Sequence, residues 1–147
     1  MRMARDSFSF TVFGFEPRPQ GSKKYVGTRK TKSGANIPLI IEASPGLPVW
    51  RKAVADAVKE AMLQSGDDSM FEGAVKVEAV FYVTRKKSVT RSLPTVPPDV
   101  DKLGRSLLDS CGFGGIWKDD SQVVRLEISK KYATGEPGVA VTISNYP

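Results

Sequence analysis

Two stretches of the sequence alternate between apolar and polar residues, and this period of two constrains the fold more than any other feature. The apolar positions of residues 73–84 are Val75, Val77, Ala79, Phe81 and Val83. Those of residues 8–15 are Phe8, Phe10 and Val12. Successive side chains of a β-strand point to opposite faces of the sheet, so each stretch predicts a strand with one buried face. We therefore expect a sheet with one side packed against a core.

Two other stretches repeat apolar residues at helical spacing. Over residues 48–64 the shared face consists of Trp50, Val54, Val58, Ala61 and Met62, and Gly66 stands where this helix would end. Over residues 99–111 it consists of Val100, Leu103, Leu107, Leu108 and Cys111, and the helix is expected to end at Gly112, Gly114 and Gly115. Residues 37–42, 122–132 and 139–144 predict further strands, the last two paired through a turn at 134–138. Strands and helices mix without strict alternation, which predicts an α+β fold with a single mixed sheet and two main helices packed on it.

Two segments without periodicity carry many bases. They are residues 16–36 and 85–98, which we expect to be long loops. No acid occurs from residue 17 to 41 or from 79 to 98. The bases of these acid-free stretches are Arg18, Lys23, Lys24, Arg29, Lys30, Lys32, Arg85, Lys86, Lys87 and Arg91. Such loops are either solvated surface or a binding surface for a polyanion.

The sequence has no histidine and a single cysteine, Cys111. Catalysis by Ser-His-Asp or Cys-His groups, histidine-ligated zinc and internal disulfides are therefore excluded. Hydrolysis would have to use carboxylates, lysines, arginines or a bound metal ion. No apolar run approaches the roughly 20 residues of a membrane helix, and the N-terminus lacks a signal-peptide core. The length of 147 residues fits a single domain, and no internal repeat or linker is found.

Five acids fall within residues 99–120: Asp99, Asp101, Asp109, Asp119 and Asp120. Taken singly, the first two would be helix-capping acids and the last two a polar turn. Taken together, they predict a metal site, because Mg²⁺ and Mn²⁺ prefer carboxylate oxygens and nucleases use such ions to activate water. With the basic segments beside it, this site favours a metal-dependent phosphodiesterase acting on a polyanion.

The motifs around these acids resemble those of the RusA-type Holliday junction resolvases. The matching residues are 98–109, PDVDKLGRSLLD, then 117–124, WKDDSQVV, and then Lys130. Residues 14–22 and the pair Trp50-Arg51 are similar to features of the phage and prophage branch, and the resemblance runs from Phe8 to Ser144. It implies a RusA-like fold and a Mg²⁺-dependent endodeoxyribonuclease, with Mn²⁺ able to substitute. The implied function is paired cleavage of Holliday junctions in DNA recombination and repair, by a homodimer in the cytoplasm without an organic cofactor.

The resemblance also implies roles for individual residues. Asp99, Asp101 and Asp120 fall on the essential metal-binding acids, and Asp119 on a less critical one. Arg105 stands where the best-studied members have a catalytically important lysine; a guanidinium keeps the charge but does not readily give up a proton. We therefore expect Arg105 to clamp a phosphate or stabilise the transition state. The residues expected to contact DNA are Arg18, Lys23, Lys24, Lys30, Lys32, Arg85, Lys86, Lys87, Lys102 and Lys130.

The sequence leaves several interpretations open. Asp109, about two helical turns after Asp101, either supports the site or is exposed. Trp50 and Cys111 are expected in the core, whereas Trp117 is a candidate for stacking on bases. The rival functions are a non-enzymatic DNA-binding recombination accessory protein and a nuclease for flaps, single strands or RNA. Residues 37–41 and the first strand are candidates for the dimer interface.

Overall fold

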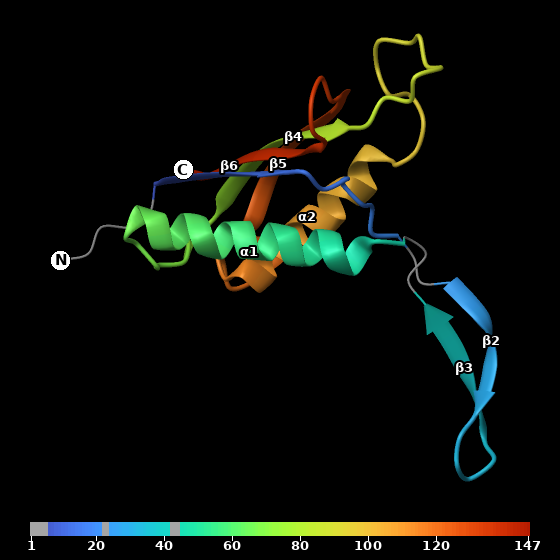
Figure 1. Ribbon diagram of the computed structural model, residues 1–147. Coiled ribbons are helices and arrows are strands. Elements are labelled where there is room, and N and C mark those ends of the chain that lie inside the picture. The colour runs from blue at the N-terminus through green and yellow to red at the C-terminus, as the bar shows by residue number, and fades with distance from the viewer. Residues whose placement is uncertain (1–5, 22–23, 42–44) are drawn as a thin grey trace.

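The computed structural model describes residues 6–21, 24–41 and 45–147, with the side chains of 24–26, 29 and 37–41 outside that description. It contains a four-stranded mixed sheet, two long helices and a separate two-stranded hairpin (Figure 1). The α+β expectation is thus confirmed. The elements in chain order are β1 (Ser7–Phe13), β2 (Lys24–Lys30), β3 (Asn36–Ile41), α1 (Leu47–Ser65), β4 (Val75–Val83), α2 (Val100–Gly114), the 3₁₀ helix η1 (Asp120–Gln122), β5 (Val123–Tyr132) and β6 (Gly138–Asn145).

The strands of the main sheet lie in the order β1-β6-β4-β5. Strand β4 is antiparallel to β6 and parallel to β5, so that Phe81 lies opposite Val139 on one side and Lys130 on the other. The predicted hairpin of residues 122–132 and 139–144 is therefore wrong. Both strands are present, but β4 lies between them. Their alternation shows which face each strand buries, and it does not show which neighbour each one pairs with.

The core lies between one face of this sheet and the two helices. Along β4, every second residue from Val75 to Val83 is buried, as predicted, and Phe8, Phe10 and Val12 of β1 are buried beside it. From α1, the buried side chains include Trp50, Val54, Val58 and Met62. From α2, they include Leu103, Leu107 and Cys111. No helix in the described part of the chain is long and apolar enough to cross a membrane.

The helix α2 continues through two glycines that were expected to end it. A side chain at Gly114 would place its Cβ 2.7 Å from Cβ of Val58 on α1, so a glycine is needed where the helices meet. The helix ends only at Gly115, whose φ of 87° is in the left-handed region. The predicted end of α1 at Gly66, with φ of 69°, is confirmed.

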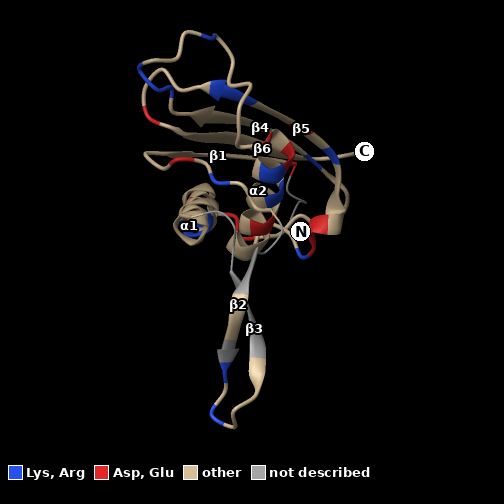
Figure 2. Cartoon of the chain, turned by 90° about the vertical axis from the view of Figure 1, so that its right-hand side faces the viewer, with Lys and Arg blue, Asp and Glu red and all other residues tan. Residues whose placement is uncertain are grey.

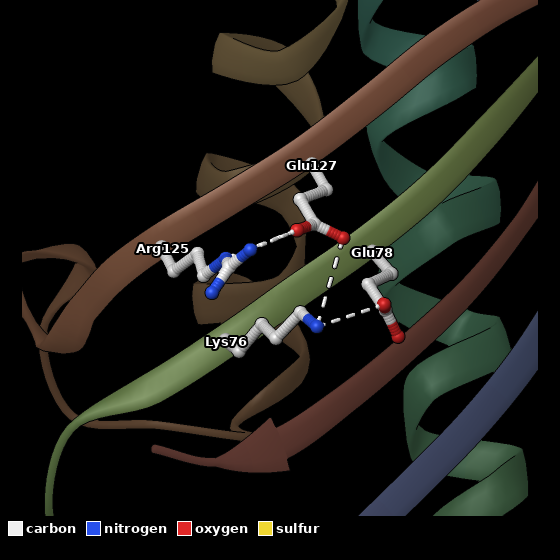
Figure 3. Close-up of polar contacts among 4 residues, drawn as sticks. All are labelled: Lys76, Glu78, Arg125 and Glu127. Carbon is white, nitrogen blue, oxygen red and sulfur yellow. Dashed lines mark hydrogen bonds and ion pairs between the residues drawn. The ribbon is translucent and has the colours of Figure 1, made fainter. Parts of the chain in front are cut away.

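The other face of the sheet is open and carries paired charges (Figure 3). On this face Lys76 Nζ lies 3.0 Å from Glu78 Oε1 and 3.6 Å from Glu127 Oε2. Arg125 Nη2 lies 2.7 Å from Glu127 Oε1. Each charged group of this cluster therefore has a partner of opposite sign.

The hairpin of β2 and β3 projects away from the sheet and helices (Figures 1 and 2). The expected loop at residues 16–36 is therefore wrong in part, because β2 lies within it. The sequence of β2 has no apolar alternation that would predict a strand. The strand forms by backbone pairing with β3, in which Lys30 lies opposite Asn36. The strand predicted at 37–42 is confirmed as β3. Residues 85–98 contain no helix or strand, as predicted.

Candidate active site

The second basic segment leads directly into α2 and is held in place at its end. The ammonium group of Lys130, on β5, donates hydrogen bonds to the carbonyl oxygens of Val96 at 2.7 Å and Pro98 at 2.8 Å. Residue 98 immediately precedes Asp99. Lys130 was expected to contact DNA. In the structure its side chain instead fixes the backbone that immediately precedes Asp99, a candidate metal ligand.

Helix capping does not account for the side chain of Asp99. This residue is the N-cap of α2, yet its side chain makes no capping hydrogen bond. The carboxylate is 57% exposed and lies 3.6 Å from the ammonium of Lys102. Asp101 follows in the first turn and Arg105 one turn later, both exposed. These three charged groups therefore lie at the start of α2 and are open to a substrate.

The adjacent acids Asp119 and Asp120 have different roles. Asp119 caps η1: its Oδ1 accepts the backbone N–H of Ser121 at 2.8 Å, and Gln122 Oε1 accepts the N–H of Asp119 at 3.1 Å. The hydrogen bonds from Ser121 lower the pKa of Asp119 below its ordinary value. The side chain of Asp119 is therefore explained by its role in a polar turn. The resemblance had assigned this residue to the less critical acid of the family.

Asp120 is half-buried and turned toward α2. Its Oδ1 accepts the indole N–H of Trp117 at 2.7 Å. Burial raises the pKa of Asp120 above its ordinary value, and a hydrogen bond with the carboxyl group of Asp109 raises it further, against the effect of Trp117. A Cβ at Gly112 would lie only 3.0 Å from Asp120 Oδ1. Gly112 therefore leaves the space that lets Asp120 reach its partners.

Asp109 is partly buried and lines the same pocket as Asp120, which favours a supporting role over simple exposure. Its Oδ2 accepts a hydrogen bond from Gln20 Nε2 at 2.5 Å. The Gln20 side chain in turn accepts a hydrogen bond from Arg51 on α1, and its backbone N–H donates to the carbonyl of Lys102 at 3.0 Å. A chain of contacts thus connects Arg51, Gln20, Asp109 and Asp120. Sequence reasoning missed Gln20, Arg51 and Gly112 as site residues, although the first two lie in segments that carried the resemblance.

Asp109 and Asp120 line a shallow pocket of about 410 Å³. Its lining residues are Asp109, Gly112, Phe113, Lys118, Asp119 and Asp120. Asp99 and Asp101 do not line it, and within the described ranges no three histidine, cysteine or acidic side chains are arranged to hold one ion. The structure therefore brings together Asp109 and Asp120, with Asp99 and Asp101 at the other end of α2. Two carboxyl groups that line one pocket offer oxygen donors of the kind that a hard divalent cation prefers.

The bases lie on both sides of these acids. Figure 2 shows the residues of the second basic segment at one end of the molecule and the hairpin at the other, with the acidic residues of α2 between them. Lys30 and Lys32 of the hairpin and Lys87 of the loop are exposed. Lys23 lies outside the described residues, as does the side chain of Lys24. The remaining bases expected to contact DNA line cavities described below or lie beside them.

Three residues singled out in the sequence are buried: Trp117, Trp50 and Cys111. Trp117 is 1% exposed, so it does not offer a ring for base stacking; it positions Asp120 instead. Trp50 is also 1% exposed, in the core as predicted. Cys111 is fully buried, as predicted, and burial raises the pKa of its thiol. The thiol is therefore inert.

The chain is similar to known proteins over most of its length. The family model "Endodeoxyribonuclease RusA" matches residues 15–144, which include both carboxylate motifs, Gln20 and Arg51. "Uncharacterized protein YqaN" of Bacillus subtilis (strain 168) is 35% identical over 150 residues, which cover 94% of this chain and 96% of that protein. Since the matched range spans nearly the whole chain, the protein belongs to the RusA endodeoxyribonuclease family, and this membership indicates an enzyme that cleaves DNA.

Proposed function

We propose that this protein is a Mg²⁺-dependent endonuclease that resolves Holliday junctions by paired phosphodiester cleavage in DNA recombination and repair. The observation that carries the proposal is that Asp109 and Asp120 line the same open pocket, with Asp109 among the groups that raise the pKa of Asp120. Neighbouring carboxylates repel each other, and a shared proton or a bound cation relieves that repulsion. In a family that cleaves DNA, a divalent cation bound here would both neutralise the two carboxylates and provide the metal for phosphodiester cleavage.

The residues that would hold Mg²⁺ are carboxylates from α2 and η1. Family correspondence favours Asp99, Asp101 and Asp120, with Asp119 as a weaker candidate. Asp119 and Asp120 line the pocket together with Asp109, which we therefore add, whereas Asp99 and Asp101 lie outside it at the start of α2. When bound, the ion supplies an activated water and stabilises charge on the phosphate. Mn²⁺ is expected to substitute because it takes the same oxygen ligands.

The protein's own side chains orient the acids and neutralise the phosphates. Trp117 holds one oxygen of Asp120, and Gln20 holds one oxygen of Asp109. Arg105, exposed one turn after Asp101, is placed to clamp a phosphate oxygen as a fixed positive charge. A guanidinium does not readily give up a proton, so we do not assign proton transfer to this residue.

The hairpin and the second basic segment are proposed to hold DNA on either side of the acids. Replacing Lys23, Lys24, Lys30 and Lys32 by Ala should flatten the salt dependence of junction binding by roughly 0.9 in slope for each lost phosphate contact. The matched control is Lys59→Ala, an exposed lysine on α1. A slope unchanged from that of the wild type would remove the hairpin from the DNA-binding surface.

We propose a homodimer as the active form. A four-way junction is cut at two positions related by approximate two-fold symmetry, and each chain carries one set of these acids. C₂ is the commonest symmetry of oligomers, and it would place one site at each cut. Light scattering of the protein, free and on the junction, should give the mass of two chains. A monomer in both states would favour nicking or flap cleavage.

A labelled synthetic four-way junction tests the function directly. We expect paired cuts with Mg²⁺, none with a chelator, and a stable complex in both conditions. Binding without cleavage in any divalent metal would support the accessory-protein alternative. Faster cleavage of flaps, single strands or RNA in the same assay would support the other nuclease alternative.

A further inference from the structure

A cavity of about 500 Å³ lies beside the start of α2, between the second basic segment and the end of β4. Its walls are largely apolar and include Val89, Pro94 and Val96 from the loop. The ring of Tyr132, at the end of β5, completes the lining. This volume is typical of small-ligand sites, roughly 300–1,000 Å³. It suits a single planar group and is too small for a duplex.

Cations hold the tyrosine ring and border the cavity. Arg91 Nη1 donates a hydrogen bond to the Tyr132 hydroxyl at 2.9 Å, and the guanidinium carbon of Arg85 lies 5.7 Å from the ring centroid. Lys86 also lines the cavity. An apolar cavity with an aromatic ring and basic groups around it matches the chemistry of a nucleobase attached to an anionic backbone.

The cavity contains one acidic side chain, which is fixed. Glu16 accepts the backbone N–H of Thr84 at 3.0 Å and the Thr84 hydroxyl at 2.6 Å. A carboxylate has more lone pairs than these two bonds use, so Glu16 can also accept from the edge of a base.

A second pocket, of about 390 Å³, adjoins the first. The two share Glu16, Pro97 and Pro98 as lining residues, and the second adds Arg18 and Lys102. An apolar cavity and a basic pocket therefore meet at the dipeptide that immediately precedes Asp99. Lys102 connects them to the site, because it also pairs with Asp99 at 3.6 Å.

We propose that the larger cavity captures one unstacked nucleobase of the strand being cut, while Arg18 and Lys102 bind the adjacent phosphate. The proposal rests on the DNA-cleaving function above and deepens it. Base capture beside Asp99 positions the neighbouring phosphodiester for cleavage. It also makes the choice of cleavage position depend on which base enters the cavity.

The test narrows the cavity without touching the acids. Val89→Trp and Val96→Trp each place a large ring in it, and both positions are in the loop, outside the core. Leu93→Trp is the matched control, because Leu93 is in the same loop, is 58% exposed and lines neither pocket. The probes are four-way junctions with 2-aminopurine at successive positions around the crossover, saturated with protein in chelator so that no strand is cut.

We expect wild type and Leu93→Trp to change 2-aminopurine emission at one position, and both cavity variants to abolish that change. Junction binding by the cavity variants should weaken by roughly fivefold, which corresponds to the loss of about one stacked base. In Mg²⁺, their preference among junctions of different sequence should also disappear.

The inference is overturned if a cavity variant with the melting temperature of the wild type gives the wild-type emission change. It is equally overturned if the wild type changes emission at no position. Failure of the proposed function gives a different result: no junction is cut in any metal, whereas the emission assay requires only binding. The two failures are therefore distinguishable.

Discussion

Two charged regions of this molecule are built on opposite principles. On the open face of the sheet, Lys76, Glu78, Arg125 and Glu127 pair base with acid (Figure 3). There the hydrogen bond from Arg125 lowers the pKa of Glu127, and the one to Glu78 raises the pKa of Lys76. Beside α2, carboxyl group meets carboxyl group, and burial together with Asp109 raises the pKa of Asp120.

We infer that the paired charges of the sheet support solubility and structure, whereas the acids beside α2 are kept for function. Exposed ion pairs are individually weak and are screened by salt, so the sheet surface is close to electrostatic balance without strong dependence on any one residue. A contact between two acids opposes folding unless a proton or cation is present. Such an arrangement is characteristic of functional sites. Substitutions at the candidate metal acids, at Arg51 and Gln20, at Gly112 and at Lys76 test this contrast.

The largest effect is expected from Asp120→Asn. Loss of the carboxylate should lower cleavage by roughly 10²–10³-fold or more, the effect of removing one charge-stabilising group from an active site. Asp99→Asn and Asp101→Asn should also abolish cleavage. All three variants should still shift a junction on a gel, because affinity comes from bases that neutralise phosphates. Full activity in any one of them would remove that residue from the site.

The same variant tests stability against pH in the absence of metal. Since the pKa of Asp120 is higher in the folded protein, the folded state binds more protons between the ordinary and the raised pKa. Stability of the wild type should therefore fall as the pH rises through this window. Asp120→Asn should remove that loss, as thermal melts at several pH values would show. An identical pH profile would mean that the acid pair does not oppose folding.

The next effect is expected at the connection from α1 to the site. Arg51→Ala and Gln20→Ala release Asp109 without removing an acid, so cleavage should fall by roughly 10–100-fold, as for other groups that orient metal ligands. The Mg²⁺ concentration needed for half-maximal cleavage should rise. Lys52→Ala is the control, because this exposed neighbour of Arg51 pairs with Asp56 on the same helix, at 2.6 Å. Equal Mg²⁺ requirements in all these proteins would argue against a positioning role.

A smaller effect is expected from Gly112→Ala. The added Cβ would lie 3.0 Å from Asp120 Oδ1, so the carboxylate must shift by a few tenths of an ångström. Alanine is favoured over glycine within a helix by about 1 kcal/mol, so the helix itself should not weaken. We expect a several-fold loss of cleavage at unchanged or higher melting temperature. Gly73→Ala, where an added Cβ meets nothing within 4 Å, should leave both unchanged.

The smallest effect is expected on the open face of the sheet. Lys76→Ala removes two ion pairs, yet the carboxylates of both pairs are exposed to solvent and the pairs are screened by salt. Cleavage should not change, and the small shift in melting temperature should disappear at high salt. A loss of activity comparable to that of Arg51→Ala would show that paired surface charge also serves function, and the contrast drawn here would fail.

Much of this architecture follows from local pattern. Alternation and helical spacing predicted β1, β4, α1 and α2 with the correct buried faces, because burial repeats with the period of the element. The carboxylate motifs identified the segments of the site, since metal chemistry restricts the residue types that can serve. Strand β2 was missed because a hairpin held together by backbone pairing leaves no period in its side chains.

The sequence by itself determined which residues form the apolar face of each main strand and helix, that α1 ends at Gly66, and which acids are candidates for a metal site. Only the tertiary structure decided that β4 lies between β5 and β6, that Asp119 caps a turn while Asp120 faces α2, and that Gln20 reaches Asp109. These features depend on contacts between distant parts of the chain. Local pattern records the environment of each residue, but the partner that supplies that environment is chosen by packing of the whole fold.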